Sequence, residues 1–241
     1  MQTSGYVALS GQIALEQRMT ALANNVANSG TAGYRAEGVR FESVVSRISP
    51  VPTSFAVSAG THVLTSSGGL VKTGNPLDVA IQGEGFMAVQ TPGGPVYTRD
   101  GRMQILNTGD LVSLNGYAVL DVVGAPITLD PAAGPPHVAR DGMISQGGRQ
   151  VGAIGLFAVD LSKPYRRFEN SGFIPASPPE PIVTFTDNGV AQGFIENSNV
   201  HPVLEMTSLI KVTRAFEALA SALEQNDASL RSAVQALGSR S

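Results

Sequence analysis

Residues 204–237 read LEMTSLIKVTRAFEALASALEQNDASLRSAVQAL and carry the most regular pattern in the chain. Positions at alternating spacings of three and four are apolar with one exception, Asn226. The nine successive positions are Leu209, Val212, Phe216, Leu219, Leu223, Asn226, Leu230, Ala233 and Leu237. This spacing is typical of a coiled-coil seam. The sequence therefore predicts a long C-terminal helix with one apolar stripe.

A helix of this length needs a partner surface. It would run ~50 Å at ~1.5 Å per residue, beyond the ~30 Å diameter of a small domain. Burying its large seam side chains would contribute roughly 10 to 20 kcal/mol as an upper limit. An isolated helix is marginally stable in water, because packing supplies most of its stability. We therefore expect this helix to pack against another helix.

The N-terminal segment supplies a candidate. Residues 6–28 contain no Pro, and Asn24, Asn25 and Asn28 precede Ser29-Gly30, residue types that end a helix. Apolar or small residues again follow the three-four spacing: Ala8, Gly11, Leu15, Met19, Leu22 and Val26. We predict that the two helices pair as a coiled-coil-like layer. Its predicted seam consists of Leu15, Met19, Leu22, Val26, Leu209, Val212, Phe216, Leu219, Leu223, Asn226, Leu230 and Leu237.

Two interpretations of this layer remain open. In one, further copies of the chain complete the packing of the two narrow seams. In the other, the helices form an intramolecular hairpin that caps the rest of the chain. Asn226 also has two interpretations: a buried amide that restricts the seam to one register or partner, or a residue that faces solvent.

The middle of the chain predicts an antiparallel β-rich domain. Short apolar runs alternate with turn dipeptides such as Asn115-Gly116 and Asp141-Gly142. The predicted strands are 77–82, 86–90, 96–98, 103–106, 117–122, 153–160 and 182–185. The fold class is thus α+β, divided into an N-terminal helix at 1–30, an irregular connection with one candidate strand at 31–67, the β domain at 68–197 and a C-terminal helix at 198–241.

The β domain contains a repeated string. Thr98-Arg99-Asp100-Gly101 and Ala139-Arg140-Asp141-Gly142 resemble each other. A duplicated functional loop would explain the repeat, but two hairpins that use the same turn chemistry explain it more simply. We therefore expect the same kind of turn at both places.

Composition excludes several function classes. A formal net charge of -3 gives no basic stripe for nucleic acid. The absence of Cys among 241 residues excludes disulfides, thiolate catalysis and Cys-ligated zinc. No apolar segment is long enough to span a bilayer, and no cleavable signal peptide is expected at the start. We expect neither a nucleic-acid partner nor a membrane-embedded segment.

Candidate catalytic and ligand-binding motifs fail on context. Gly83-Glu84-Gly85 with Ala88 matches G-x-G-x-x-A, but a dinucleotide site needs a helix after the glycines, and a strand is predicted there. His62, His137 and His201 stand apart from one another and from carboxylates in the sequence. We therefore expect no enzyme activity, no cofactor and no metal site.

Three stretches resemble one protein family. Residues 22–35, which include Asn24, Asn25, Asn28, Gly33 and Tyr34, are similar to the N-terminal signature of flagellar rod and hook proteins. Residues 73–86 and 97–101 resemble the central segment of that family, and residues 196–200, followed by 205–206 and 214–217, resemble its C-terminal part. His201-Pro202 departs from the usual pattern, where Asn and a small residue follow. Pro is tolerated in a first helical turn, so only a local change is expected there.

The resemblance implies a structural subunit of the flagellar basal-body rod, with paired terminal helices that line the tube. Its implied partners are copies of itself, other rod subunits and the flagellar type III export apparatus, which uses no cleaved signal. The implied location is the rod that crosses the periplasm and transmits torque. Length and the Met1-Gln2-Thr3 start favour a proximal-rod member. A distal-rod or hook member, or a soluble β-domain binding module or enzyme with capping helices, is the alternative.

Overall fold

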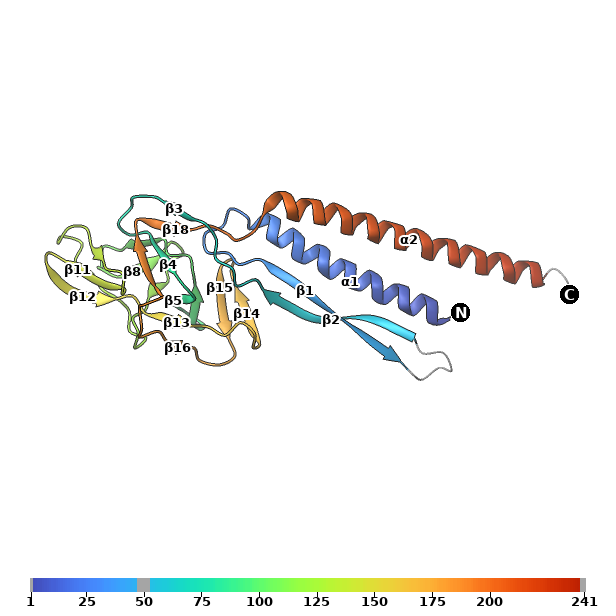
Figure 1. Cartoon of the computed structure of the whole chain (residues 1–241), viewed down its shortest axis with the longest axis horizontal. Helices are drawn as coiled ribbons and strands as arrows, with labels where there is room; N and C mark the ends of the chain where they lie inside the picture. The colour runs from blue at the N-terminus through green and yellow to red at the C-terminus, as the bar shows by residue number, and fades with distance from the viewer. Residues whose placement is uncertain (1, 47–52, 239–241) are drawn as a thin grey trace. The chain divides into compact units, whose positions relative to one another are not determined.

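The computed structural model describes residues 2–46 and 53–238 and divides into two compact units (Figure 1). The helical unit comprises residues 1–27, 37–63 and 201–241, and the β unit comprises residues 28–36 and 64–200. The chain therefore crosses between the units four times. Two helices at the ends and an antiparallel β-rich middle confirm the α+β class.

The helical unit contains two helices and one β hairpin. Helix α1 spans Gln2–Ala27 and helix α2 spans Pro202–Gly238. The helices lie side by side in opposite directions, and α1 also packs against the hairpin (Figure 1). The hairpin consists of β1, Glu37–Ser46, and β2, Thr53–Val63. Both predicted helices are thus present, and α2 begins at Pro202, a residue suited to a first helical turn.

The predicted irregular connection at 31–67 contains two strands instead of one candidate strand. The hairpin register slips between Arg40 and Phe41, where a bulge interrupts the pairing. A bulge breaks the period-two alternation that would have marked a strand in the sequence. A lone two-stranded hairpin is marginal in water, so its packing on α1 stabilises it. Pro50 and Pro52 lie outside the described residues.

The β unit is built from short antiparallel strands. Its largest sheet has nine strands, in the order β14-β15-β6-β5-β9-β8-β7, with β13 paired to β5 and β16 paired to β13. The β unit also contains a three-stranded sheet, β10-β11-β12, and the strand pairs β17-β4 and β18-β3. The strands are β3 Leu70–Lys72, β4 Val79–Gln82, β5 Gly85–Thr91, β6 Gly94–Thr98, β7 Met103–Ile105, β8 Leu111–Ser113, β9 Ala118–Val119, β10 His137–Val138, β11 Met143–Gln146, β12 Arg149–Ala153, β13 Leu156–Ala158, β14 Tyr165–Phe168, β15 Gly172–Pro175, β16 Glu180–Pro181, β17 Gly189–Gln192 and β18 Phe194–Glu196.

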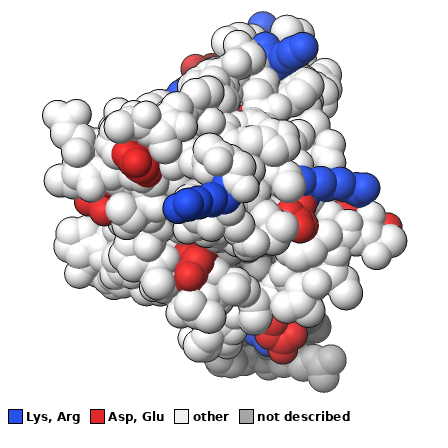
Figure 2. Space-filling view, turned by 90° about the vertical axis from the view of Figure 1, so that its left-hand side faces the viewer, with Lys and Arg blue, Asp and Glu red and all other residues white. Residues whose placement is uncertain are grey.

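The β unit has its own apolar core. Its buried residues come from many strands and include Val79, Ile81, Met87, Leu111, Val119, Ile144 and Leu156. All but one of the predicted strand segments contain an observed strand, and residues 182–185 are the exception. On the face shown in Figure 2, Lys and Arg alternate with Asp and Glu over a mostly uncharged surface.

The two similar segments, residues 98–101 and 139–142, do not form the same kind of turn. Gly142 has a φ of 84° and its N–H donates to the Ala139 carbonyl oxygen, as expected of a tight turn. Gly101 has no positive φ and instead lies against the Val79 backbone, where a Cβ would come within 1.7 Å of the carbonyl oxygen. Their arginines differ as well: Arg99 is buried and Arg140 is exposed. The expectation of a common turn was therefore wrong.

Candidate functional site

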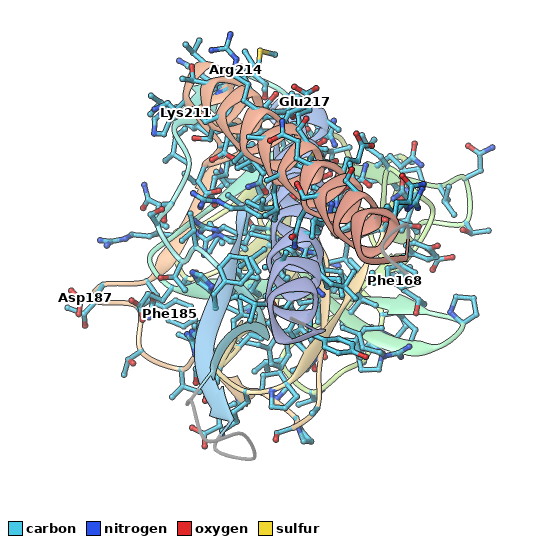
Figure 3. All side chains as sticks on the ribbon, turned by 90° about the vertical axis from the view of Figure 1, so that its right-hand side faces the viewer. Phe168, Phe185, Asp187, Lys211, Arg214 and Glu217 are labelled. Carbon is cyan, nitrogen blue, oxygen red and sulfur yellow. The ribbon has the colours of Figure 1, made fainter. Side chains whose placement is uncertain are left out.

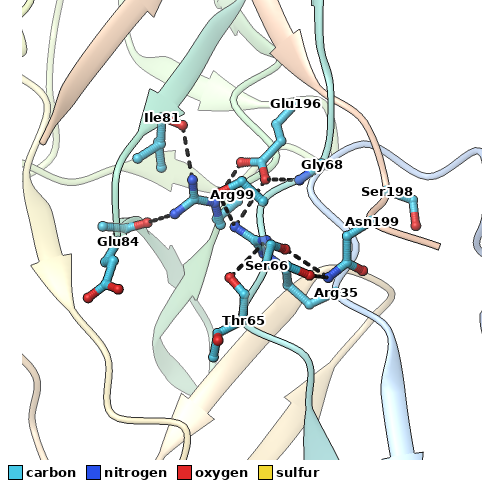
Figure 4. Close-up of polar contacts among 12 residues, drawn as sticks. Arg35, Thr65, Ser66, Gly68, Ile81, Glu84, Arg99, Glu196, Ser198 and Asn199 are labelled. Atoms are coloured by element: carbon cyan, nitrogen blue, oxygen red, sulfur yellow. Dashed lines mark hydrogen bonds and ion pairs between the residues drawn. The ribbon is translucent and has the colours of Figure 1, made fainter.

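The three family-like stretches meet at one carboxylate in the β unit, Glu196 (Figure 4). The Arg99 Nε lies 2.6 Å from Glu196 Oε2, and the Arg35 Nη2 lies 3.0 Å from Glu196 Oε1. All three side chains are buried. We call Arg35, Arg99 and Glu196 the junction cluster. It joins segments that are more than sixty residues apart in the sequence.

Backbone groups complete the hydrogen bonding of the junction cluster. Arg99 donates to the carbonyl oxygens of Ile81 and Gly85, and Arg35 donates to those of Thr65 and Ser66. The Gly68 N–H donates to Glu196 Oε1 over 2.9 Å. A buried charge is tolerated only when such partners satisfy it. The cluster thus fixes two backbone stretches, residues 65–68 and 81–85, around two arginines and one carboxylate.

Electrostatics within the cluster are unbalanced. Burial and the neighbouring Arg99 charge lower the pKa of Arg35 to about 10, while the Glu196 carboxylate opposes this shift. Arg35 is therefore still protonated at neutral pH, and two guanidinium charges share one carboxylate. Replacing Glu196 by a neutral residue would leave both positive charges buried without a counter-charge.

Gly33, one of the family-like residues, touches the same place. Its N–H donates to the Glu196 carbonyl oxygen over 2.8 Å, and its φ is 67°. A Cβ on Gly33 would lie 2.4 Å from the Asp100 nitrogen. Both the backbone conformation and the close approach therefore require glycine.

Replacing Gly33 by Ala should lower the free energy of unfolding of the β unit by about 2 kcal/mol or more, because strain and steric overlap add. Urea unfolding of the purified variant measures this change. Gly30→Ala is the matched control, since a Cβ on Gly30 would have no atom within 4 Å and its φ is not in the left-handed region. Equal stability of the two variants would contradict the close approach at Gly33.

Asn199 fastens two further segments of the β unit. Its Oδ1 accepts from the Ala36 N–H over 2.7 Å, and its Nδ2 donates to the carbonyl oxygens of Leu64 and Ser66. Tyr34 is buried beside Val200, and the Arg167 guanidinium lies 4.8 Å from the Tyr34 ring centroid. Side chains thus hold together the family-like segments at the two ends of the β unit. Asn199 does so through hydrogen bonds to backbone groups, as a paired strand would.

Asn25 has the same role inside the helical unit. Its Nδ2 donates to the Glu37 carbonyl oxygen and its Oδ1 accepts from the Glu37 N–H, each over 2.9 Å. Asn25 is buried, as are Ala14 and Ala21 at positions consistent with the same helical face. The Asn run of the first motif therefore ties the end of α1 to the start of β1, with Asn24 exposed and Asn28 half-buried.

Two contacts join α1 and α2 at residues of the predicted seam, Met19 and Leu219. The Met19 sulfur lies 3.6 Å from Thr213 Oγ1, and Leu219 lies against Gly11, where its side chain would be 3.3 Å from an added Cβ. Val212 is buried and Asn226 is exposed in the single chain. The side chains of Leu230 and Leu237 lie outside those described. Half-buried seam residues are Leu15, Met19, Leu22, Val26, Leu209, Phe216, Leu219 and Leu223.

Large apolar side chains are exposed on other faces of both helices. Apart from Leu204 they follow the three-four spacing, and they range from 48% exposed for Ile13 to 76% for Val203. Lys211, Arg214 and Glu217, by contrast, lie on exposed polar positions of α2 (Figure 3). Contiguous exposed apolar residues mark interaction surfaces in soluble proteins. The exposed apolar residues are Tyr6, Leu9 and Ile13 on α1, and Val203, Leu204, Met206 and Ile210 on α2.

The described residues contain no group of three or more His, Cys, Asp or Glu side chains placed to hold a metal ion. No helix in the described part is long and apolar enough to cross a membrane. The glycines at 83 and 85 lead into strand β5 rather than a helix, so the context of a dinucleotide fingerprint is missing.

The helical unit is built from both chain ends and exposes apolar stripes. The β unit is held together by its own family-like motifs. These two features define the class of a structural subunit. Family models agree. The model described as "Flagella basal body rod protein" matches residues 6–35, "Flagellar hook protein FlgE/F/G D1 domain" matches residues 80–146, and "Flagellar basal body rod FlgEFG protein C-terminal" matches residues 191–236.

Curated relatives extend the similarity over the whole chain. The flagellar basal-body rod protein FlgF of Mesorhizobium japonicum is 50% identical, with all of both chains covered. FlgF of Rhizobium meliloti is 45% identical over 99% of each chain, and FlgG of Bacillus subtilis is 31% identical over 97% of this chain and 98% of its own. The chain belongs to the flagellar basal-body rod protein family. It is a structural protein and not an enzyme, and within the family it is FlgF-like.

Proposed function

We propose that this chain is a subunit of the proximal part of the flagellar rod, where it helps to transmit torque across the periplasm. The exposed apolar stripes on α1 and α2 carry this proposal, since they leave apolar surface that a neighbouring subunit can cover. The proximal position rests on the higher identity to FlgF than to FlgG. Its partners are copies of itself and other rod subunits.

The paired helices form a coiled-coil-like layer in this proposal. Support comes from the contacts of Met19 with Thr213 and of Gly11 with Leu219, each of which joins α1 to α2 through one predicted seam residue. The intramolecular pairing buries one stripe of each helix, and subunit contacts cover the others. Both interpretations of the layer, an internal hairpin and assembly with further copies, then hold at once.

Delivery to the rod follows the route that the family resemblance implies. The flagellar type III apparatus exports the chain without a cleaved signal peptide. The absence of Cys means that no disulfide has to form after export. A formal net charge of -3 gives no reason to expect a nucleic-acid partner.

A complementation experiment tests the exposed apolar residues of α1 as an assembly surface. A strain that lacks the gene receives a variant copy, and its swimming is measured. The double variant Leu9→Asp, Ile13→Asp should abolish complementation, because charges would have to be buried between subunits. Both side chains are about half exposed in the single chain, so the free energy of unfolding of the purified variant should change by about 1 kcal/mol or less. Arg18→Asp, at an exposed position five residues after Ile13 and therefore on another face of α1, is the matched control and should swim normally. Normal swimming of the double variant would refute the proposed surface.

A further inference from the structure

A cavity of about 530 Å³ lies beside the junction cluster, and all of its lining residues belong to the β unit. Sites for small molecules commonly have volumes of this order. Arg35 and Arg99 form part of its lining, although they are only 2% and 1% exposed to solvent. The cavity therefore borders two buried arginines, which Figure 4 shows with their partners.

Both arginines keep N–H groups that the junction cluster does not use. A guanidinium carries five N–H donors. Among the described residues, three acceptors lie within hydrogen-bond distance of the Arg99 guanidinium and four of the Arg35 guanidinium. At least one N–H on each side chain is therefore left for a further acceptor.

The junction cluster also carries a surplus of one positive charge, because two guanidiniums share the single Glu196 carboxylate. Burial and the Arg99 charge both lower the pKa of Arg35, so the surplus is unfavourable where it stands. Solvent screens buried charges much less than exposed ones. A monovalent anion in the cavity would balance the surplus, whereas a dianion would replace it by a surplus of negative charge.

The exposed part of the lining also disfavours a second negative charge. Glu84, Asp160 and Glu180 are exposed there, and they carry three carboxylates. Lys163 is the exposed cation of the lining, and its Nζ already lies 3.5 Å from an Asp160 carboxylate oxygen. These exposed charges are screened by solvent, so they weaken the binding of one anionic group without preventing it.

Apolar side chains stand next to the buried positive charge. Phe86 and Leu161 are buried and Ile182 is half-buried, and all three line the cavity. The Arg99 guanidinium carbon lies 5.6 Å from the centroid of the Phe86 ring. A ligand that fits this lining therefore carries an apolar body beside its charged group. Guanidinium N–H groups match the geometry of carboxylate oxygens, so a carboxylate is the anionic group that fits best.

We propose that this cavity binds a small organic monocarboxylate, with its carboxylate against Arg35 and Arg99 and its apolar body against Phe86 and Leu161. The site lies wholly within the β unit, so the proposal does not depend on the chain's assembly into a rod. A ligand that binds only the folded chain stabilises it. Occupation of the cavity would therefore strengthen the part of the β unit that the junction cluster holds together.

Isothermal titration calorimetry of the purified full chain with sodium hexanoate tests the proposal. Hexanamide has the same apolar body without the charge, and adipate carries a second carboxylate. We expect hexanoate to bind about tenfold or more tightly than either compound, because only hexanoate supplies one negative charge and an apolar body. No binding of hexanoate, or equal binding of the three compounds, would overturn the proposal.

Variants that fill the cavity test where hexanoate binds. Ala158, on β13, and Ser177 are exposed residues of the lining. Ala158→Phe and Ser177→Phe should each weaken hexanoate binding about tenfold or more, because the added ring occupies the space of the ligand. Ala132→Phe, at an exposed position of the β unit outside the lining, is the matched control and should bind hexanoate as the natural chain does. Normal binding by either cavity variant would overturn the proposed site.

A variant of Lys163 distinguishes the buried arginines from the exposed lysine as the partner of the carboxylate. The Lys163 side chain is 60% exposed, so Lys163→Gln should change the affinity for hexanoate by less than about threefold. This variant leaves the junction cluster intact and should fold normally. A loss of binding as large as that of Ala158→Phe would place the carboxylate at Lys163 and would overturn its assignment to Arg35 and Arg99.

Discussion

Replacing Glu196 by Gln should lower the free energy of unfolding of the β unit by about 3 to 5 kcal/mol, the typical cost of breaking a buried ion pair by removing one partner. Arg35 and Arg99 would then be buried without a counter-charge, although the shape of the side chain is almost unchanged. Such a loss is a large part of the roughly 5 to 15 kcal/mol that stabilises a typical domain. We therefore expect a β unit that is partly unfolded at 37 °C.

Tyrosine fluorescence during urea unfolding measures this loss, because four of the five tyrosines lie in the β unit and the chain has no Trp. Glu84→Gln is the matched control: the same chemical change at an exposed position should stay within about 0.5 kcal/mol of the natural chain. If Glu196→Gln is as stable as Glu84→Gln, the junction cluster does not hold the β unit together.

Removing either terminal helix should abolish rod assembly and swimming while the β unit stays folded. Deletion of residues 2–27 or of residues 202–241 removes one partner of the same helix pair, and the remaining helix then has no intramolecular surface to cover its seam. The β unit keeps its core and its junction cluster, since every residue of both lies in 28–36 or 64–200.

Tyrosine fluorescence and the urea midpoint of the β unit should therefore match those of the full chain in both deletions. A swimming strain that carries either deletion would contradict the role of the helices. A deletion that also unfolds the β unit would contradict its independence.

The helices could be predicted from the sequence because their pattern is local. The three-four spacing extends over many turns, and Asn25, Asn28 and Gly30 mark where α1 ends. Some tight turns were equally predictable, since Gly116 and Gly142 have the positive φ that their dipeptides indicate, whereas Gly101 does not. In both cases the physical cause lies within a few residues of the effect.

The hairpin at 37–63 and the junction cluster could not be predicted in the same way. The hairpin is stabilised by α1, and its bulge at Arg40 hides the alternation of a strand. Arg35, Arg99 and Glu196 are brought together only by the fold, and each alone is an ordinary charged residue. The sequence signal that could have pointed to the cluster was that each of the three residues belongs to one of the three family-like motifs. Contacts among these motifs in the fold would explain why the family shares them.

We propose that this chain is built into the rod and is held there by its helical unit. Mass spectrometry of purified basal bodies tests it most directly, in strains that express either the natural chain or the chain without residues 2–27. We predict that the natural chain is present in rods in a fixed ratio to other rod proteins and that the deleted chain is absent from them, although it is expressed. Basal bodies that lack the natural chain, or that retain the deleted one, would contradict the claim.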